Sequence, residues 1–333
     1  MGDYVSISKA DWDNALKLLV QKYAFYAPVN SGENIDYKII SEENISAIIY
    51  NTPKPTTPLK LFMNPVKQLV SGPPEQQQQI ICGVPACDLM ALNLLDEMYL
   101  DNDYTDIFYK ANRERSILIG TDCFSSLEHC HCVSADINPF PEKYQDLSLA
   151  RVNGNMLLAA KTEKGETLLK EIASSTTSRK INFQEQEYLT KQRAKVKDEL
   201  KNKNKNLPGY NASGGLIKKS PESIWKKYAE TCVACGACAT ICPTCTCFLL
   251  IDKPAFEKVK QLDACQYPAF EKVAAGEDPL KESFKRFRNR YLCKYIWKPE
   301  HFDAIACTGC GRCIECCIGD INKNELLTEL AQA

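Results

Sequence analysis

Histidine is scarce in this chain of 333 residues, which contains only His129, His131 and His301. This scarcity argues against a metal site built mainly from imidazole ligands. No apolar stretch approaches the roughly 20 residues that a membrane-spanning helix needs, so we expect no membrane span. The 41 basic and 42 acidic side chains leave a formal net charge of −1, which disfavours nucleic-acid binding through bulk positive charge.

Two further signals are missing from the sequence. Neither a G-x-G-x-x-G fingerprint nor a P-loop is present, so no dinucleotide site can be recognised from its motif. The first residues show no basic segment followed by an apolar one, the pattern of a secretory signal, and we therefore expect a cytoplasmic protein.

Cysteine, by contrast, is abundant. The chain has 18 cysteines, and 13 of them lie between Cys232 and Cys317. Clustered cysteines in a chain without secretory features indicate metal binding more than disulfide bonds.

The first half of the chain alternates between strand-like and helical patterns, which predicts an α/β domain over residues 1–180. An amphipathic helix is expected over residues 8–23, with Ser8 as its N-cap. A second helix is expected over 88–99. The predicted strands cover residues 37–40, 47–50, 79–84, 116–119 and 156–160.

The rest of the chain reads differently. Residues 181–221 combine a charged helix with a turn-rich segment, LPGYNASGG, which has the composition of a linker. Residues 222–333 are predicted to form a second, mostly α-helical domain. Its expected helices cover residues 221–229, 255–262, 279–296 and 323–330.

This second domain contains an internal repeat. Two C-x2-C-x2-C-x3-C motifs begin at Cys232 and Cys307, and a glycine follows the second cysteine of each. Such spacing is typical of [4Fe–4S] ferredoxins, in which the fourth cysteine of one motif binds the cluster held by the other. Zinc is the alternative, but zinc sites usually pair two C-x2-C knuckles across a longer gap.

The spacing therefore predicts two [4Fe–4S] clusters with crossed ligands. The first would be held by Cys232, Cys235, Cys238 and Cys317. The second would be held by Cys307, Cys310, Cys313 and Cys242. An uncrossed assignment uses the same eight residues, and Cys316 is an alternative to Cys317 because Ile318 stands where proline usually follows.

A third [4Fe–4S] cluster is predicted in the α/β domain. Four cysteines lie on loops that follow predicted strands, and such loops can meet at one edge of a sheet. Its ligands would be Cys87, Cys123, Cys130 and Cys132. The alternatives are zinc bound with His129 or His131, and no metal.

Several other features remain open. Cys245, Cys247 and Cys265 either pack beside the first cluster or form a further metal site, whereas Cys82 and Cys293 are expected in the core. The basic stretch over residues 281–298 is interpreted as a solvated helix face, a docking face for an acidic partner, or compensation for cluster charge.

Four segments together resemble a known family: Gly83–Leu89 (GVPACDL), Cys123 to Cys132, Cys242–Phe248 (CPTCTCF) and Cys307–Ile314 (CTGCGRCI). They are similar to the iron–sulfur beta subunit of cytoplasmic nickel–iron hydrogenases (sulfhydrogenases) and to the related iron–sulfur subunit of anaerobic sulfite reductase. The resemblance covers roughly residues 80–325. His131, where the family often has an aromatic residue, and Ile318 depart from the pattern.

The resemblance implies a helical two-cluster ferredoxin domain on an α/β domain, within a heteromeric anaerobic complex. The implied role is non-catalytic electron transfer between a flavin- and NAD(P)-binding subunit and a catalytic subunit of the hydrogenase or sulfur reductase type. A sulfite reductase or another dehydrogenase complex is the alternative, and a self-sufficient flavin-dependent reductase is a further one.

Overall fold

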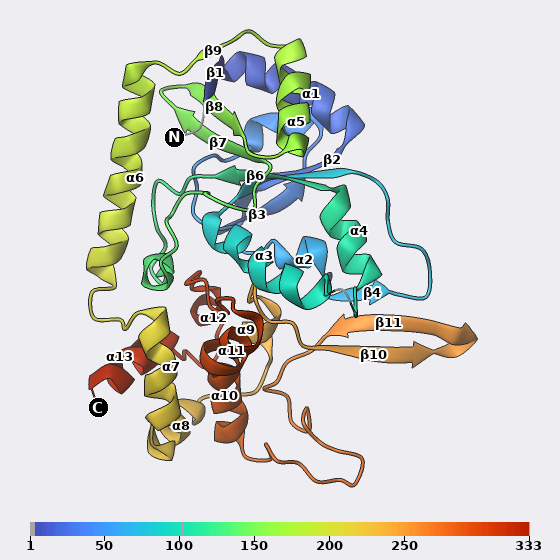
Figure 1. Ribbon diagram of the computed structural model, residues 1–333, viewed down its shortest axis with the longest axis vertical. Helices are drawn as coiled ribbons and strands as arrows, with labels where there is room; N and C mark the ends of the chain where they lie inside the picture. Colours follow the sequence, from blue (N-terminus) through green and yellow to red (C-terminus); the bar gives the residue numbers. More distant parts are fainter. Residues whose placement is uncertain (1–3, 102, 333) are drawn as a thin grey trace.

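The computed structural model describes residues 4–101 and 103–332, which form an upper sheet-rich region and a lower helical region (Figure 1). The upper region is built on an eight-stranded sheet of order β3-β2-β5-β6-β7-β8-β1-β9. The strands are β1 (Val5–Ser8), β2 (Ala24–Ser31), β3 (Asn34–Ile39), β5 (Gln79–Val84), β6 (Ser116–Thr121), β7 (Leu147–Val152), β8 (Asn155–Ala160) and β9 (Ser178–Lys180).

The centre of the sheet is parallel. Strands β2, β5, β6 and β7 pair in parallel, and the outer strands pair antiparallel. Every residue of β5 (QIICGV) and β6 (SILIGT) is buried, as expected for parallel strands covered on both faces.

Helices cover both faces of the sheet. Trp12, Leu16 and Leu19 of α1 pack with α5 against one face, where they form the largest apolar cluster. On the other face, α3 and α2 enclose a second apolar cluster. The helices of this region are α1 (Lys9–Lys22), α2 (Lys60–Met63), α3 (Ala86–Tyr99), α4 (Ile107–Arg115) and α5 (Glu163–Ser174).

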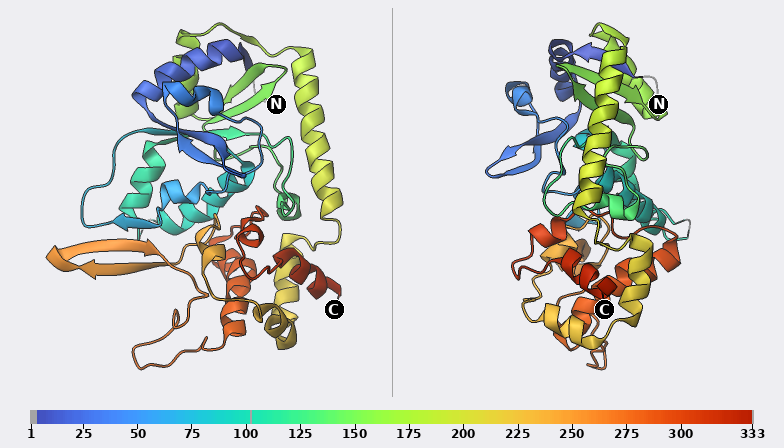
Figure 2. Two further views of the ribbon diagram at one scale, coloured as in Figure 1. Left: turned by 180° about the vertical axis from the view of Figure 1, so that it is seen from behind. Right: turned by 90° about the vertical axis from the view of Figure 1, so that its left-hand side faces the viewer.

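The 21-residue helix α6 (Phe183–Lys203) runs down the side of the molecule and connects the two regions (Figures 1 and 2). The lower region consists mainly of short helices: α7 (Tyr210–Lys219), α8 (Glu222–Ala229), α9 (Ala237–Thr240), α10 (Ser283–Leu292), α11 (Lys298–Phe302), α12 (Arg312–Glu315) and α13 (Lys323–Gln332). A π-helical turn, η4 (Cys293–Trp297), continues α10.

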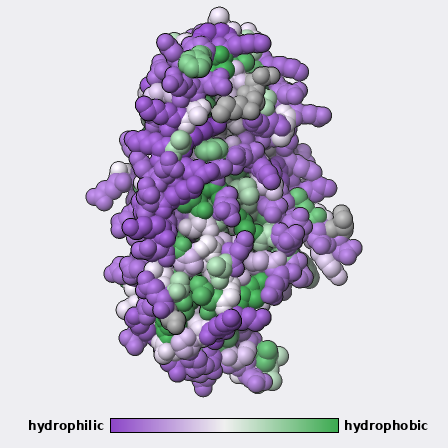
Figure 3. All heavy atoms as spheres, turned by 60° about the vertical axis from the view of Figure 1, so that its left-hand side comes forward, coloured by the Kyte–Doolittle hydropathy of each residue, from purple (hydrophilic) through white to green (hydrophobic). Residues whose placement is uncertain are grey.

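A projecting hairpin links the two regions by a second route. Strands β10 (Phe248–Lys253) and β11 (Glu257–Leu262) pair antiparallel, and β4 (Lys67–Leu69) from the first half of the chain joins β11. This three-stranded sheet lies beside the main body in Figure 2. The face shown in Figure 3 is mostly hydrophilic, and its hydrophobic residues gather in the lower half, over the helical region.

The expected α/β region followed by a mainly helical region is observed. The helix over residues 8–23 is confirmed, and the Ser8 side chain accepts a hydrogen bond from the backbone N–H of Asp11. The strands expected over 37–40, 79–84, 116–119 and 156–160 correspond to β3, β5, β6 and β8. The helices expected over 88–99, 221–229, 279–296 and 323–330 correspond to α3, α8, α10 with η4, and α13.

Three local expectations are wrong. The strand expected over 47–50 is the end of a 3-10 helix, Glu42–Ala47, and irregular chain. The helix expected over 255–262 is mostly strand β11, since pairing with β10 and β4 outweighs local helix propensity. Most of the linker-like LPGYNASGG segment, from Tyr210 onward, forms the first part of helix α7, whose Ile217 is completely buried. The division of the chain at residues 180 and 221 stays a prediction.

Candidate metal centres

The first cavity lies in the helical region and brings together five cysteines from the two motifs. It is lined by Cys232, Cys235, Cys238, Cys313 and Cys317, and Cys316 does not line it. Gly236, at φ +73°, lets the loop turn beside α9, where a Cβ would collide with the ring of Tyr267. The cavity thus combines the first three cysteines of the first motif with Cys313 and Cys317 of the second, and it brings Cys317 to the first motif, as the crossed arrangement requires.

Two cysteines of the second set, Cys242 and Cys307, lie near Lys294, which is almost completely buried. Its Nζ donates hydrogen bonds to Cys242 Sγ (3.0 Å) and to the carbonyl oxygen of Ala306 (2.9 Å), the residue before Cys307. Burial alone would lower the pKa of Lys294, but the cysteines, Cys242 first, hold it well above its usual value. Burial raises the pKa of Cys310 to about 12 against the lowering effect of Arg312, and Cys242 and Cys313 add to the rise.

Cys307 has its own cationic neighbour. Burial alone would raise the pKa of its thiol, but the charge of Lys323 holds it well below the usual range. The thiolate, which is the form that binds iron, is therefore the favoured state of this side chain.

The third cavity lies at the end of the main sheet where the chain leaves the central strands β5 and β6. It is lined by Cys87, Cys123, Cys130 and Cys132, together with Cys310 of the second motif. Cys87 lies in the first turn of α3, where the helix dipole stabilises negative charge. Burial raises the pKa of Cys87, Cys123 and Cys132, so these thiols favour the protonated form without a metal.

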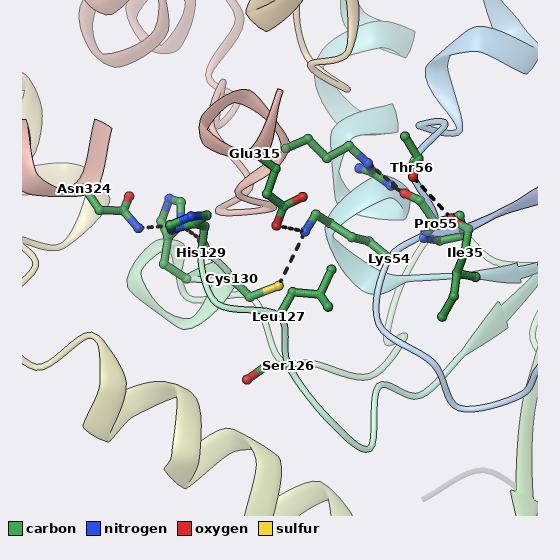
Figure 4. Close-up of polar contacts among 12 residues, drawn as sticks. Ile35, Lys54, Pro55, Thr56, Ser126, Leu127, His129, Cys130, Glu315 and Asn324 are labelled. Carbon is green, nitrogen blue, oxygen red and sulfur yellow. Dashed lines mark hydrogen bonds and ion pairs between the residues drawn. The ribbon is translucent and has the colours of Figure 1, made fainter. Parts of the chain in front are cut away.

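Lys54 supplies a positive charge at the edge of this third cavity (Figure 4). Its Nζ lies 2.6 Å from Glu315 Oε1 and 3.9 Å from Cys130 Sγ. Burial would lower its pKa, but Cys130 and Glu315 raise it, so the charged form is retained. Lys54 from the first half of the chain therefore faces both the third cavity and α12.

The buried cations near the cysteines indicate whether the surroundings suit a negatively charged cluster. Burying an unpaired charge is costly. Within the described part of the chain, the hydrogen bonds of Lys294 go to Cys242, Thr244 and Ala306, with no carboxylate among them. Arg290 is also buried, and its Nε has no hydrogen-bond partner. A thiolate-ligated iron–sulfur cluster is negatively charged and fits these surroundings.

Zinc fits the third cavity less well. Lys323 Nζ lies 2.9 Å from Nε2 of His131, and because an ammonium can only donate, Nε2 accepts. Nδ1 then carries the proton and donates to the His129 carbonyl oxygen (2.8 Å). Both ring nitrogens of His131 are thus occupied. Across residues 4–101 and 103–332, no three His, Cys, Asp or Glu side chains are grouped closely enough for a single metal ion.

Three more cysteines lie between the cavities and the hairpin. The interaction of the Cys242 and Cys245 thiols lowers the pKa of Cys242 well below its usual range and raises the pKa of Cys245 well above it. The interaction with the Cys265 thiol lowers the pKa of Cys247 to about 6, against the effect of burial. Cys82, by contrast, lies in the apolar core as expected, and Cys293 is partly buried.

The basic stretch over residues 281–298 is only partly solvated. Arg286, Arg290 and Lys294, spaced by four residues, are all buried on one side of α10 and η4. Arg290 Nη2 donates to the Cys238 carbonyl oxygen (3.2 Å), and Lys294 contacts Cys242. Of the three interpretations of this stretch, compensation of negative charge agrees with these contacts. The four-residue spacing of the three cations is the sequence signal that could have indicated their shared face.

These features define an iron–sulfur protein: residues 231–321 match the family model described as a 4Fe-4S dicluster domain. The chain is also similar to "Sulfhydrogenase 2 subunit beta" of Pyrococcus furiosus. The two are 27% identical over 344 residues, which cover 99% of this chain and 98% of the relative. The resemblance to the sulfhydrogenase beta subunit, inferred from the motifs, is thereby confirmed. No described helix has both the length and the apolar character needed to cross a membrane.

Proposed function

We propose that this chain is the iron–sulfur subunit that relays electrons inside an oxidoreductase complex. The observation that carries the proposal is the grouping of cysteines around two cavities and one buried lysine, within a chain that matches a 4Fe-4S dicluster domain. Bound clusters would supply one-electron transfer. The absence of a recognised substrate motif, noted from the sequence, agrees with a relay rather than a catalytic role.

The proposed ligand sets keep the crossed assignment that the motif spacing predicts, while Cys313 also lines the first cavity and Cys310 the third. The first cluster would be held by Cys232, Cys235, Cys238 and Cys317. The second would be held by Cys242, Cys307, Cys310 and Cys313. The third would be held by Cys87, Cys123, Cys130 and Cys132. Around them the chain excludes water and offsets negative charge with Arg290, Lys294 and Lys54.

The partners follow from the similarity over the whole chain. The relative is named as the beta subunit of a sulfhydrogenase, so we propose a complex with a catalytic subunit of the hydrogenase or sulfur reductase type. The electron donor or acceptor on the other side is proposed to be a flavin- and NAD(P)-binding subunit. Co-purification of the tagged chain from its own cells, followed by peptide sequencing of the partners, tests both assignments.

The number of clusters is tested by measuring iron, acid-labile sulfide and zinc per chain after anaerobic purification. Three clusters predict about twelve iron and twelve sulfide. Cys87→Ser should remove about four of each. Cys82→Ser is the matched control, since Cys82 lies in the neighbouring strand β5 but faces the apolar core. About eight iron in the wild type would contradict the third cluster, and zinc in place of iron would overturn the function.

A further inference from the structure

Helix α6 runs along the sheet-rich region (Figure 1), and an open cleft of about 500 Å³ lies between them. Cavities that bind small molecules typically enclose about 300–1,000 Å³, so this cleft is large enough for such a ligand. None of the described residues that line it is a cysteine, so the cleft is separate from the three proposed ligand sets. A ligand bound in it would not depend on the proposed clusters.

The cleft is lined by segments that are far apart in sequence. Phe140 and Pro141 lie in the loop before β7, and Lys161 directly follows β8. Helix α6 contributes one face, because its residues in the cleft recur at spacings of three and four: Thr190, Arg193, Ala194 and Lys197. The cleft thus combines an aromatic ring and a proline ring with cationic side chains.

Contacts on one side hold the Arg193 guanidinium in place. Its Nε and Nη2 pair with the Asp122 carboxylate at 2.6 and 3.0 Å, and Nη2 also donates to the Tyr4 hydroxyl at 3.0 Å. The guanidinium carbon lies 4.6 Å from the centre of the Phe140 ring. Within the described part of the chain, no hydrogen bond involves Nη1, so its two N–H groups are oriented in advance for a ligand.

The cleft also carries an excess of positive charge. Lys161 and Lys197 line it together with Arg193, whereas Glu142 is the single acidic side chain among its described lining residues. Neither lysine ammonium has a hydrogen bond or an ion pair with another described residue. Glu142 accepts a hydrogen bond from Asn138 Nδ2 at 2.9 Å. A cleft lined mainly by charges of one sign concentrates its field, so this one attracts anions.

We propose that this cleft binds an organic phosphate, with the phosphate group held by Lys161, Lys197 and Nη1 of Arg193. Ammonium and guanidinium groups are the usual partners of phosphate oxygens, and three cations suit a dianionic phosphate. The cleft is much larger than a bare phosphate ion needs, and the rings of Phe140 and Pro141 offer an apolar surface to the rest of the ligand. Adenosine monophosphate and flavin mononucleotide carry the same phosphate group on different ring systems, so the two serve as probes.

The test titrates the anaerobically purified full chain with adenosine monophosphate, flavin mononucleotide or inorganic phosphate in an isothermal calorimeter. We expect a nucleotide to bind at one site per chain, more tightly than inorganic phosphate, and to bind more weakly as salt is added. The tighter of the two nucleotides identifies the ring system that the cleft accepts. Lys161→Met and Lys197→Met should each weaken this binding about tenfold, because each removes one hydrogen bond between charged groups.

Lys195→Met is the matched control, because Lys195 is an exposed lysine of the same helix that does not line the cleft. This variant should bind the nucleotide as the wild type does. The proposal is overturned if none of the three probes binds, if inorganic phosphate binds as tightly as both nucleotides, or if Lys195→Met weakens binding as much as the other two variants. All three variants should keep their iron, since none changes a proposed cluster ligand.

Discussion

Arg312 and Asp88 form a buried two-point ion pair across the boundary between the helical and sheet-rich regions. Arg312 Nη2 lies 2.9 Å from Asp88 Oδ2, Nη1 approaches Oδ1, and the side chains are only 1% and 0% exposed. Arg312 also donates twice to the Pro55 carbonyl oxygen, at 3.0 and 2.8 Å. Since Arg312 precedes Cys313 and Asp88 follows Cys87, the pair fixes the second motif against the third cavity.

Arg312→Met should destabilise the protein strongly. Among the described residues, the variant leaves the buried Asp88 carboxylate with only the Leu59 N–H as a partner, and breaking a buried pair in this way costs about 3–5 kcal/mol. Anaerobic urea unfolding of the holoprotein, followed by circular dichroism, measures this change.

The control for this prediction is Lys110→Met. Lys110 pairs with Glu114 on the surface of α4 at 4.0 Å, and exposed pairs of this kind contribute about 0–1 kcal/mol. Equal effects of the two substitutions would show that burial does not determine the strength of the Arg312 pair.

Lys294→Met should lower the reduction potential of the cluster that Cys242 is proposed to bind. A cation near a cluster stabilises its reduced, more negative form, and the Nζ lies 3.0 Å from Cys242 Sγ. Loss of a unit charge at such range predicts a shift of about 50–150 mV toward negative values. Potentiometric titration monitored by electron paramagnetic resonance reports it cluster by cluster.

Lys218→Met serves as the control, since Lys218 is exposed near the end of α7 and should leave every potential unchanged. An unshifted set of potentials in Lys294→Met, with full iron content, would contradict the electrostatic role of Lys294.

Gly311→Ala should impair cluster retention. Gly311 has φ +76°, and a Cβ there would lie 2.5 Å from the carbonyl oxygen of His129. The added methyl group therefore strains the loop of the second motif and pushes it from the third cavity, so we expect loss of about four iron per chain or more. Iron analysis after anaerobic gel filtration measures the loss.

Gly215→Ala is the matched substitution. Gly215 lies in α7 with open space around its Cα, and alanine there should stabilise the helix by about 0.5–1 kcal/mol with unchanged iron. The prediction fails if both variants retain iron equally.

Alkylation of Cys247 should follow an unusually acidic pH profile. The interaction with the Cys265 thiol lowers the pKa of Cys247 to about 6, so its thiolate is present above pH 6 and lost as the pH falls below it. Iodoacetamide labelling of the reduced holoprotein, quantified by mass spectrometry, should show a midpoint near that value.

In Cys265→Ser the labelling midpoint of Cys247 should move upward, toward the usual cysteine pKa of about 8.5. The reason is that the serine hydroxyl does not replace the interaction between the two thiols. An unchanged midpoint would show that Lys298, rather than Cys265, determines the acidity of Cys247.

The sequence predicted the elements and residues whose signals are local. Strand β5 was predicted with its observed bounds because six consecutive residues, QIICGV, are bounded by polar and turn residues. The eight cysteines of the repeat were recognisable because cluster ligation depends on short spacings. Strand β11 was not predicted from its sequence, EKVKQL. Its strand pairing and the Lys260–Asp106 ion pair (2.6 Å) form only in the folded chain.

The residues around the cysteines could not be predicted for the same reason. Lys294 contacts Cys242, and Lys323 contacts His131, across long stretches of sequence, so no local pattern records these pairs. The grouping of Cys87 with Cys123 was foreseen only as an expectation from strand ends. It depends on β5 and β6 being neighbours in the sheet, which the pairing Gln79 to Ser116 establishes.

The cavity shared by Cys232, Cys235, Cys238 and Cys317 also has a consequence for biosynthesis. Chains leave the ribosome from the N-terminus, and their early domains fold first. The three cysteines of the first motif therefore emerge well before their fourth partner, and the cavity cannot close until Cys317 has been synthesised. A nascent or prematurely terminated chain would present an incomplete set of cysteines, so insertion of the proposed first cluster would be restricted to chains translated as far as the second motif.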